Sequence, residues 1–170
     1  MHRFHSAQRD PIFFDRSLGG RLNAPDAGYG VLYSAKGPRG AFAESFLRTP
    51  GRRTLDPALQ AAKAYAILQA SRTLTLINFN GPGLARLGAT AEVVHGGLPY
   101  DIPQAWSRAL HDHPISADGL AYTARHDPDE LCYALFERAA PAIGEQARRT
   151  DLDSDWFWDL AEVYALAKAP

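Results

Sequence analysis

Glycine and proline are the residues that most restrict how this chain can fold. The sequence holds 14 Gly and 12 Pro in 170 residues, and they punctuate its first half densely. Both residues mark turns and interrupt regular elements, so we expect short strands and helices joined by turns. Hydrophobic residues make up 46% of the chain and charged residues 22%, as in ordinary globular proteins. Residues 1–170 are therefore expected to form a single domain around one core.

Charge and cysteine content exclude several classes of protein. The formal net charge of −1 gives no overall attraction to nucleic acid or to an anionic membrane. The apolar stretches are too short to cross a bilayer, and the first residues lack the order of a signal peptide. The single cysteine, Cys132, cannot form an internal disulfide and is expected to be a buried, inert thiol. We expect a cytoplasmic protein that binds neither nucleic acid nor membranes.

The order of apolar segments predicts an α+β domain. Strands are expected over residues 30–34, 65–70, 73–78, 119–123 and 131–136, and helices over 41–48, 84–87, 103–111 and from 153 onward. Only Ser71 and Arg72 separate the second and third strands, which predicts a tight hairpin. The last two strands are expected to pair as neighbours. Because strands and helices do not alternate strictly, the sheet should be antiparallel or mixed, with short flanking helices.

A Gly-Gly-Arg-Leu-Asn segment at residues 19–23 is the first candidate for a binding site. Two glycines let the backbone bend closely, while Arg21 presents a planar, permanently charged group that suits a diphosphate. A surface turn with a solvated arginine is the alternative interpretation. The segment is not a dinucleotide-binding glycine fingerprint, because no suitable apolar strand precedes it.

Tyr33 and Glu44 form a second candidate. Tyr33 ends a predicted strand and Glu44 lies on the helix that follows, so a ring for stacking and a carboxylate could meet at one mouth of the sheet. A carboxylate there could stabilise a developing oxocarbenium ion. Alternatively, Glu44 faces solvent and pairs with Arg48 four residues later. Neighbouring Ser45 is expected to pack in the interior.

Metal binding and a hydrolytic triad are not expected. His111 and His113 are two residues apart and would point to nearly opposite sides of a helix, with no carboxylate-rich partner motif nearby. No serine stands in a Gly-x-Ser-x-Gly elbow, and Cys132 lies within a predicted apolar strand.

The ordered set of segments resembles the RES domain family, named after its Arg, Glu and Ser. Arg3 in an opening strand, the Gly-Gly-Arg-x-Asn turn, a Val-Leu-Tyr strand at 31–33 and an Ala-Phe-Ala-Glu-Ser-Phe helix at 41–46 follow in the family's order and spacing. Segments 97–100, 118–122, 125–128 and 132–138, together with Trp106, are similar to its second half. No single segment is specific, but the ordered set covers nearly the whole chain.

This resemblance implies a fold similar to that of ADP-ribosyltransferases and an activity that breaks the nicotinamide–ribose bond of NAD by phosphorolysis or hydrolysis. Inorganic phosphate would be a possible co-substrate and no metal would be needed. Such proteins usually act as toxins, each inhibited by an Xre-type helix-turn-helix antitoxin that plugs the pocket.

By matching positions, the resemblance also implies roles for individual residues. Arg3 and Arg21 would hold the diphosphate, and Asn23 belongs to the same binding motif. Arg125 and His126 could line the pocket mouth and contribute to binding, or form an exposed loop pair. Tyr33 would stack near the nicotinamide ribose, and Glu44 would be the catalytic carboxylate.

The sequence departs from the family at the last letter of its name. The family serine is expected where residues 122–127 read Tyr-Thr-Ala-Arg-His-Asp, so Ala124 replaces a hydroxyl. Thr123 could restore it only if the strand carries a bulge, because adjacent strand residues face opposite sides. A catalytically impaired protein that binds a nucleotide or a protein is therefore one alternative, and a protein ADP-ribosyltransferase is another.

Overall fold

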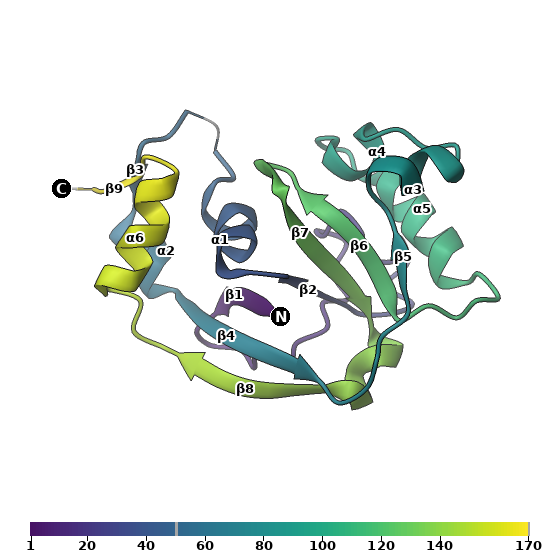
Figure 1. The fold of residues 1–170 in the computed structure, drawn as a ribbon, viewed down its shortest axis with the longest axis horizontal. Coiled ribbons are helices and arrows are strands. Elements are labelled where there is room, and N and C mark those ends of the chain that lie inside the picture. The colour runs from purple at the N-terminus through teal and green to yellow at the C-terminus, as the bar shows by residue number, and fades with distance from the viewer. Residues whose placement is uncertain (50, 170) are drawn as a thin grey trace.

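The computed structural model describes residues 1–49 and 51–169 as one large sheet with short helices around it (Figure 1). The strands are β1 (His2–Ser6), β2 (Val31–Ala35), β3 (Thr54–Leu55), β4 (Lys63–Ala70), β5 (Leu76–Asn78), β6 (Gly119–Ala124), β7 (Asp127–Phe136), β8 (Ile143–Arg149) and β9 (Ala167–Lys168). The helices are α1 (Pro38–Phe46), α2 (Pro57–Ala61), α3 (Gly81–Arg86), α4 (Glu92–His95), α5 (Asp101–His111) and α6 (Asp155–Val163), with a 3-10 helix, η1 (Glu137–Ala142).

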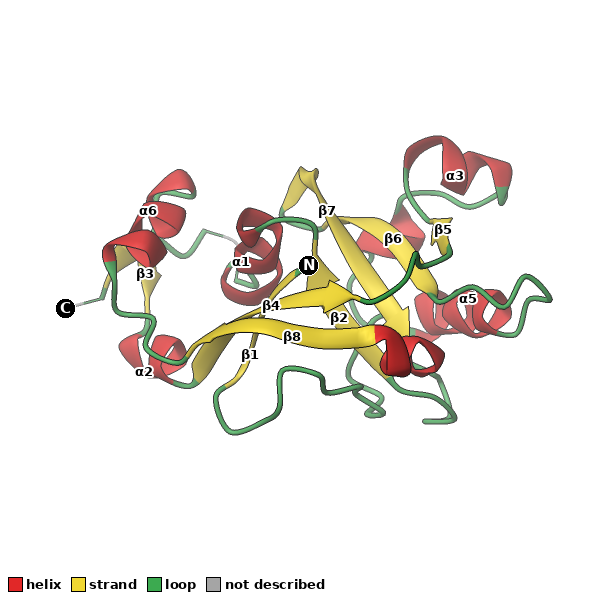
Figure 2. Ribbon diagram, turned by 60° about the horizontal axis from the view of Figure 1, so that its bottom comes forward, coloured by secondary structure: helices red, strands yellow, loops and turns green. Residues whose placement is uncertain are grey.

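The sheet confirms the predicted α+β class. Seven strands lie in the order β5-β6-β7-β2-β1-β4-β8, and every neighbouring pair is antiparallel except β5 and β6. Helices α2 and α6 lie at one end of the sheet, and α3 and α5 at the other (Figure 2). The helices are as short as the density of glycine and proline predicts. Within the described ranges, no helix combines the length and apolar character needed to span a membrane.

The sheet is joined at its centre by a narrow contact. β1 and β2 are opposed where His2 faces Ala35, at the first residue of β1 and the last of β2. β1 continues along β4, from His2 opposite Ile67 to Ser6 opposite Lys63, whereas β2 continues along β7. The two halves of the sheet therefore separate beyond this contact, and helix α1 lies between them (Figure 1).

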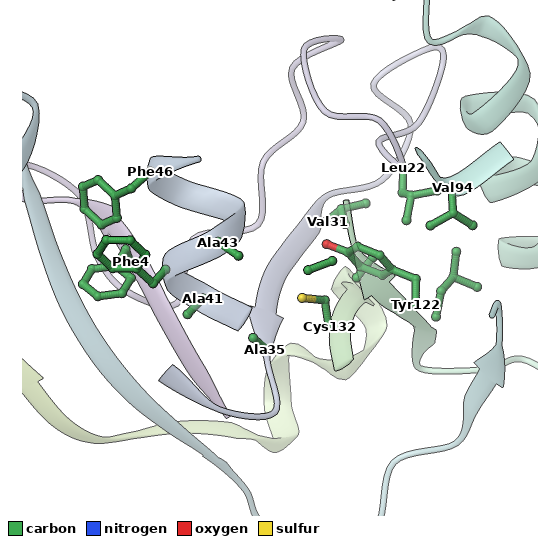
Figure 3. Packing of buried hydrophobic residues seen from close by; sticks show 14 of the residues in the cluster. Phe4, Leu22, Val31, Ala35, Ala41, Ala43, Phe46, Val94, Tyr122 and Cys132 are labelled. Carbon is green, nitrogen blue, oxygen red and sulfur yellow. The ribbon is translucent and has the colours of Figure 1, made fainter. Parts of the chain in front are cut away.

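Helix α1 is fixed by a buried aromatic cluster. Pro38 occupies its first turn, where a missing N–H costs nothing and a fixed φ favours the helix. Phe42 and Phe46 contact Phe4 of β1, with ring centroids 6.1 Å and 5.1 Å away, and Phe157 of α6 packs against all three. Figure 3 shows Phe4 and Phe46 of this cluster on one side of α1 and Tyr122, Val31 and Cys132 on the other. This packing holds the outward-facing residues of α1 at the opening between the two halves of the sheet.

The predicted hairpin of residues 65–70 and 73–78 is wrong. β4 pairs with β1 and β8, whereas β5 lies at the opposite edge of the sheet beside β6. Ser71 and Arg72 lack the glycine or asparagine that a two-residue hairpin turn favours. The Arg72 guanidinium instead binds both oxygens of Asp118 at 2.8 Å and 2.7 Å, and the Thr75 N–H donates to the same carboxylate. This ion pair directs the chain across the sheet to β6.

The pairing of the last two predicted strands is confirmed. β6 and β7 are antiparallel neighbours joined by Arg125 and His126 alone, so most of the polar segment after His126 belongs to β7. Cys132 is fully buried within β7, as expected.

Candidate active site

The opening between β1, β2 and α1 contains a cavity of about 490 Å³. Residues of β1 and β2, the turn at residues 19–22, the outer face of α1 and the β6–β7 connection line it. Glu44, Tyr33, Arg21, Arg3 and Arg125, which the sequence singled out, all contribute to its wall. Five side chains drawn from distant parts of the chain therefore lie around one space large enough for a nucleotide-sized ligand.

Positive charge predominates in this cavity. Among the described residues its wall has six arginine or lysine side chains and three carboxylates, namely Arg3, Arg9, Arg21, Arg48, Lys63 and Arg125 against Asp10, Asp15 and Glu44. The net charge of the whole protein is close to zero, so the excess of cations is local to this cavity. Such a wall favours an anionic ligand and repels a cationic one.

Glu44 is held at the cavity by the chain connecting β6 to β7. Its Oε1 accepts a hydrogen bond from the Arg125 backbone N–H at 2.8 Å. The side chain is half-buried and does not pair with Arg48, whose Nε instead donates to the Glu44 backbone carbonyl at 3.1 Å. The alternative interpretation, a solvated Glu44–Arg48 ion pair, is therefore not what the structure contains.

Tyr33 presents its ring to the cavity and keeps its hydroxyl occupied. The hydroxyl accepts a hydrogen bond from the Leu22 N–H at 2.9 Å and donates one to Asn23 Oδ1 at 2.9 Å. Burial raises the pKa of Tyr33 above its usual value. Because its hydroxyl is hydrogen-bonded within the protein, Tyr33 offers a ligand its ring, which is suited to stacking.

Asn23 lies behind the cavity wall and is fully buried. Its Nδ2 donates to Asp15 Oδ2 at 2.9 Å and to the Ser17 carbonyl at 2.7 Å, while its Oδ1 receives the Tyr33 hydroxyl. All the polar atoms of its side chain thus contact protein. Asn23 fixes the turn and Tyr33, and the structure gives it no direct face on the cavity.

Gly20 is required by this arrangement. A Cβ at position 20 would lie 2.3 Å from Asn23 Oδ1 and 2.5 Å from its Cγ, whereas one at position 19 would lie 3.5 Å from Ser17 Oγ. Gly20→Ala should therefore displace Asn23 and lower the free energy of unfolding by about 1–3 kcal/mol. Urea denaturation would measure this change. Gly19→Ala is the matched control, and equal stability of the two variants would contradict this explanation.

Arg21 is the cationic side chain best placed to receive an anion. Its guanidinium lies 5.6 Å over the ring of Tyr100, and its buried Nε has no hydrogen-bond partner. Within the described residues, no carboxylate forms an ion pair with it. An arginine stacked on an aromatic ring with its donors unused is preorganised for a phosphate group.

Arg3 has a structural contact as well as a place in the cavity wall. Its Nη1 donates to the carbonyl of Pro11 at 3.0 Å and to that of Phe13 at 3.4 Å. Burial lowers the pKa of Arg3 to about 10, an effect that Asp10 and Asp15 partly oppose. Arg3 therefore remains charged at neutral pH and anchors the loop after β1 beside the cavity.

The β6–β7 connection closes the wall next to Glu44. The Arg125 side chain is exposed, and it is the backbone N–H of this residue that holds Glu44. His126 also lines the cavity, and burial, with a further contribution from Arg125, lowers its pKa. At neutral pH, His126 is accordingly an uncharged hydrogen-bonding group.

Several lining residues were not found as candidates in the sequence. Tyr122 is 2% exposed, and burial, then the nearby Glu44, raise its pKa well above the usual value, so its hydroxyl stays protonated. Its position two residues before Ala124, on the same strand face, was the available signal. Ser45, expected to pack in the interior, lines the cavity, as do Arg48 and Lys63. Ser45, Arg48 and Lys63 reach the cavity because β1 and β2 separate, and no local sequence pattern predicts that separation.

The replacement at Ala124 is not compensated by Thr123. The β6–β7 register does shift between these two residues, as a bulge would require. The Thr123 hydroxyl nevertheless lies 3.2 Å from His95 Nε2, and neither Thr123 nor Ala124 lines the cavity. Ala124 is fully buried next to the N–H that holds Glu44.

One of the two histidines considered for metal binding, His111, packs against an aromatic ring. His111 stacks on Tyr29 with ring centroids 3.8 Å apart and contacts Asp112 through Nδ1. Across residues 1–49 and 51–169, no group of three or more His, Cys, Asp or Glu side chains is arranged to hold a metal ion.

Comparisons with known proteins agree with this architecture. The model of the RES domain family matches residues 1–159. A chain of the crystal structure described as the M. tuberculosis MbcT–MbcA toxin–antitoxin complex is similar, with a TM-score of 0.76 and 16% sequence identity. The match covers 95% of this chain and 87% of that one. No curated protein matches the sequence. The family match covers most of the chain, and the structural match extends over nearly all of its fold.

Proposed function

This chain belongs to the RES domain family, and on that premise we propose that it is an enzyme that breaks the nicotinamide–ribose bond of NAD. The observation that carries the proposal is Glu44, held by the Arg125 N–H at 2.8 Å in a cavity whose wall is rich in arginine. A carboxylate held in a wall where cations outnumber carboxylates suits a substrate that combines an anionic diphosphate with a ribose that becomes cationic as its bond breaks.

Four lining residues have a defined part in the proposed reaction. Arg21, assisted by Arg3, binds the diphosphate oxygens through charged hydrogen bonds. The ring of Tyr33 packs against the nicotinamide ribose. As the C1′–N bond breaks, its electron pair stays with nicotinamide, which leaves as a neutral molecule. Glu44 stabilises the positive charge that then develops on the ribose.

The acceptor is either inorganic phosphate or water. An oxygen of the acceptor forms the new bond to C1′, giving ADP-ribose 1″-phosphate in the first case and ADP-ribose in the second, with loss of a proton from water. Chromatography of the products of NAD incubated with the purified protein, with and without phosphate, distinguishes the two. Intact NAD under both conditions, with a folded protein, would exclude either reaction.

Restoring the family hydroxyl should raise activity. Ala124→Ser adds a hydroxyl at a buried position next to the Arg125 N–H that holds Glu44. One neutral hydrogen bond contributes about 0.5–1.5 kcal/mol, so kcat/KM for NAD should rise by about tenfold or less. Ala121→Ser on the same strand is the control, because residues 121 and 124 are three apart and face opposite sides of β6.

The outcome of this comparison also tests the alternative function. Turnover that is present only in Ala124→Ser would show that the missing hydroxyl disables catalysis in the natural chain, and no turnover in either folded protein would favour a binding role. Equal turnover of the parent and Ala124→Ser would show that the missing hydroxyl does not limit the reaction.

We further propose that a partner protein of the Xre-type helix-turn-helix class inhibits this chain at the cavity. Leu18, Leu98 and Ile102 are 60%, 81% and 66% exposed, and each is close in sequence to the lining residues Gly19 or Tyr100. Exposed apolar side chains near a cavity are typical of a protein-binding surface. Co-expression with the candidate partner should relieve growth inhibition, and a Leu98→Asp, Ile102→Asp double variant should lose this relief.

A further inference from the structure

A second cavity of about 120 Å³ adjoins the first and has no part in the function proposed above. It shares Ser45, Arg48 and Lys63 with the main cavity and extends toward β3, α2 and Leu166 near β9. Its occupant would therefore lie directly beside a ligand in the main cavity.

The walls of this side cavity carry positive charge that the protein does not neutralise. Arg48, Arg52 and Lys63 line it, and among the described residues no carboxylate does. Arg52 and Lys63 have no ion pair in that part of the chain, and the Arg48 side chain uses only its Nε, on the Glu44 carbonyl. Asp56, the nearest carboxylate in sequence to Arg52, accepts a hydrogen bond from the Ala58 N–H at the start of α2 and does not line the side cavity.

The electrostatics of Lys63 agree with an unfilled anion site. Burial lowers its pKa, and the positive charges of Arg48 and Arg3 lower it further. An anion bound between these cations would remove their repulsion, most strongly beside the half-buried Lys63, because Arg48 and Arg52 are exposed.

Size and hydrogen-bonding groups restrict the anion. Ser45, Thr49 and Thr54 add hydroxyl groups to the same wall. A volume of about 120 Å³ is several-fold below the roughly 300–1,000 Å³ typical of pockets for drug-sized ligands. The space therefore suits a small, highly charged oxyanion and is too small for a second nucleoside.

We propose that the side cavity binds a phosphate dianion, at a site separate from the arginines that face the diphosphate in the main cavity. The proposal rests on the proposed function, because the phosphate is either the free co-substrate or the 2′-phosphate of an NADP molecule in the main cavity. Both sources present the same chemistry to Arg48, Arg52 and Lys63.

Arg52→Gln tests the site, since Arg52 lines the side cavity and not the main one. Arg53→Gln is the matched control, because Arg53 is the exposed neighbour that lines neither cavity. Isothermal titration with inorganic phosphate, and separately with NAD and NADP in a Glu44→Gln background, requires no turnover. The test therefore remains decisive even if the protein does not cleave NAD.

Phosphate binding that Arg52→Gln weakens by about threefold to tenfold, and Arg53→Gln leaves unchanged, would establish free phosphate as the occupant. NADP binding tighter than NAD binding, with the preference lost in Arg52→Gln, would establish the 2′-phosphate. Identical binding of all three ligands by Arg52→Gln and Arg53→Gln would overturn the proposal. So would an equal loss of NAD and NADP affinity in Arg52→Gln, which would place the dinucleotide's own diphosphate there.

Discussion

Glu44→Gln is expected to lower kcat for NAD cleavage by about 10²–10³, the usual effect of removing one group that stabilises charge in a transition state. Glutamine keeps the size of the side chain and an oxygen that can accept the Arg125 N–H. The cavity should therefore keep its shape, and the Kd for NAD should change little. The loss should appear in kcat, because the charge on the ribose develops only as the bond breaks.

Glu162→Gln provides the control for this experiment. Glu162 is an exposed residue of α6, away from the lining of the main cavity. It should retain parental kcat and stability. If Glu44→Gln cleaved NAD as fast as Glu162→Gln, Glu44 would have no catalytic role.

Arg21→Gln should weaken NAD binding by about tenfold to a hundredfold, which corresponds to the loss of charged hydrogen bonds worth about 1.5–3 kcal/mol. The guanidinium lies over Tyr100, and within residues 1–49 and 51–169 it has no ion pair and its buried Nε has no partner, so its removal breaks no ion pair there. The effect should fall mainly on Kd or KM, since the diphosphate keeps its charge throughout the reaction.

Arg86→Gln is the corresponding control, because Arg86 is exposed on α3 and does not line the main cavity. Binding of NAD should also weaken with added salt in the parent and less so in Arg21→Gln. Unchanged NAD affinity in Arg21→Gln would place the diphosphate elsewhere in the cavity.

The sequence predicted the class of the fold better than the paths between its strands. Turn-forming residues and apolar segments identified β2, β6 and β7, because these strands are bounded by local signals. The path from β4 to β5 could not be predicted locally. It depends on Arg72 meeting Asp118, 46 residues away, and such a contact leaves no periodic pattern.

The sequence singled out three main residues of the candidate site, but it did not predict the position of Asn23 or the contribution of Lys63. Arg21, Tyr33 and Glu44 could be singled out from residue type and order, and all three line one cavity. The inward role of Asn23 could not be foreseen, because only the folded turn brings its amide against the Tyr33 hydroxyl. Lys63 belongs to the site because β4 pairs with β1, which the hairpin prediction concealed.

The release of nicotinamide from NAD tests the central claim most directly. The purified protein and Glu44→Gln would be incubated with NAD under identical conditions, and nicotinamide would be quantified against the NAD consumed. The account predicts one nicotinamide per NAD consumed by the parent and almost none from Glu44→Gln. Folded parent protein that binds NAD and releases no nicotinamide, or equal release by the two proteins, would contradict it.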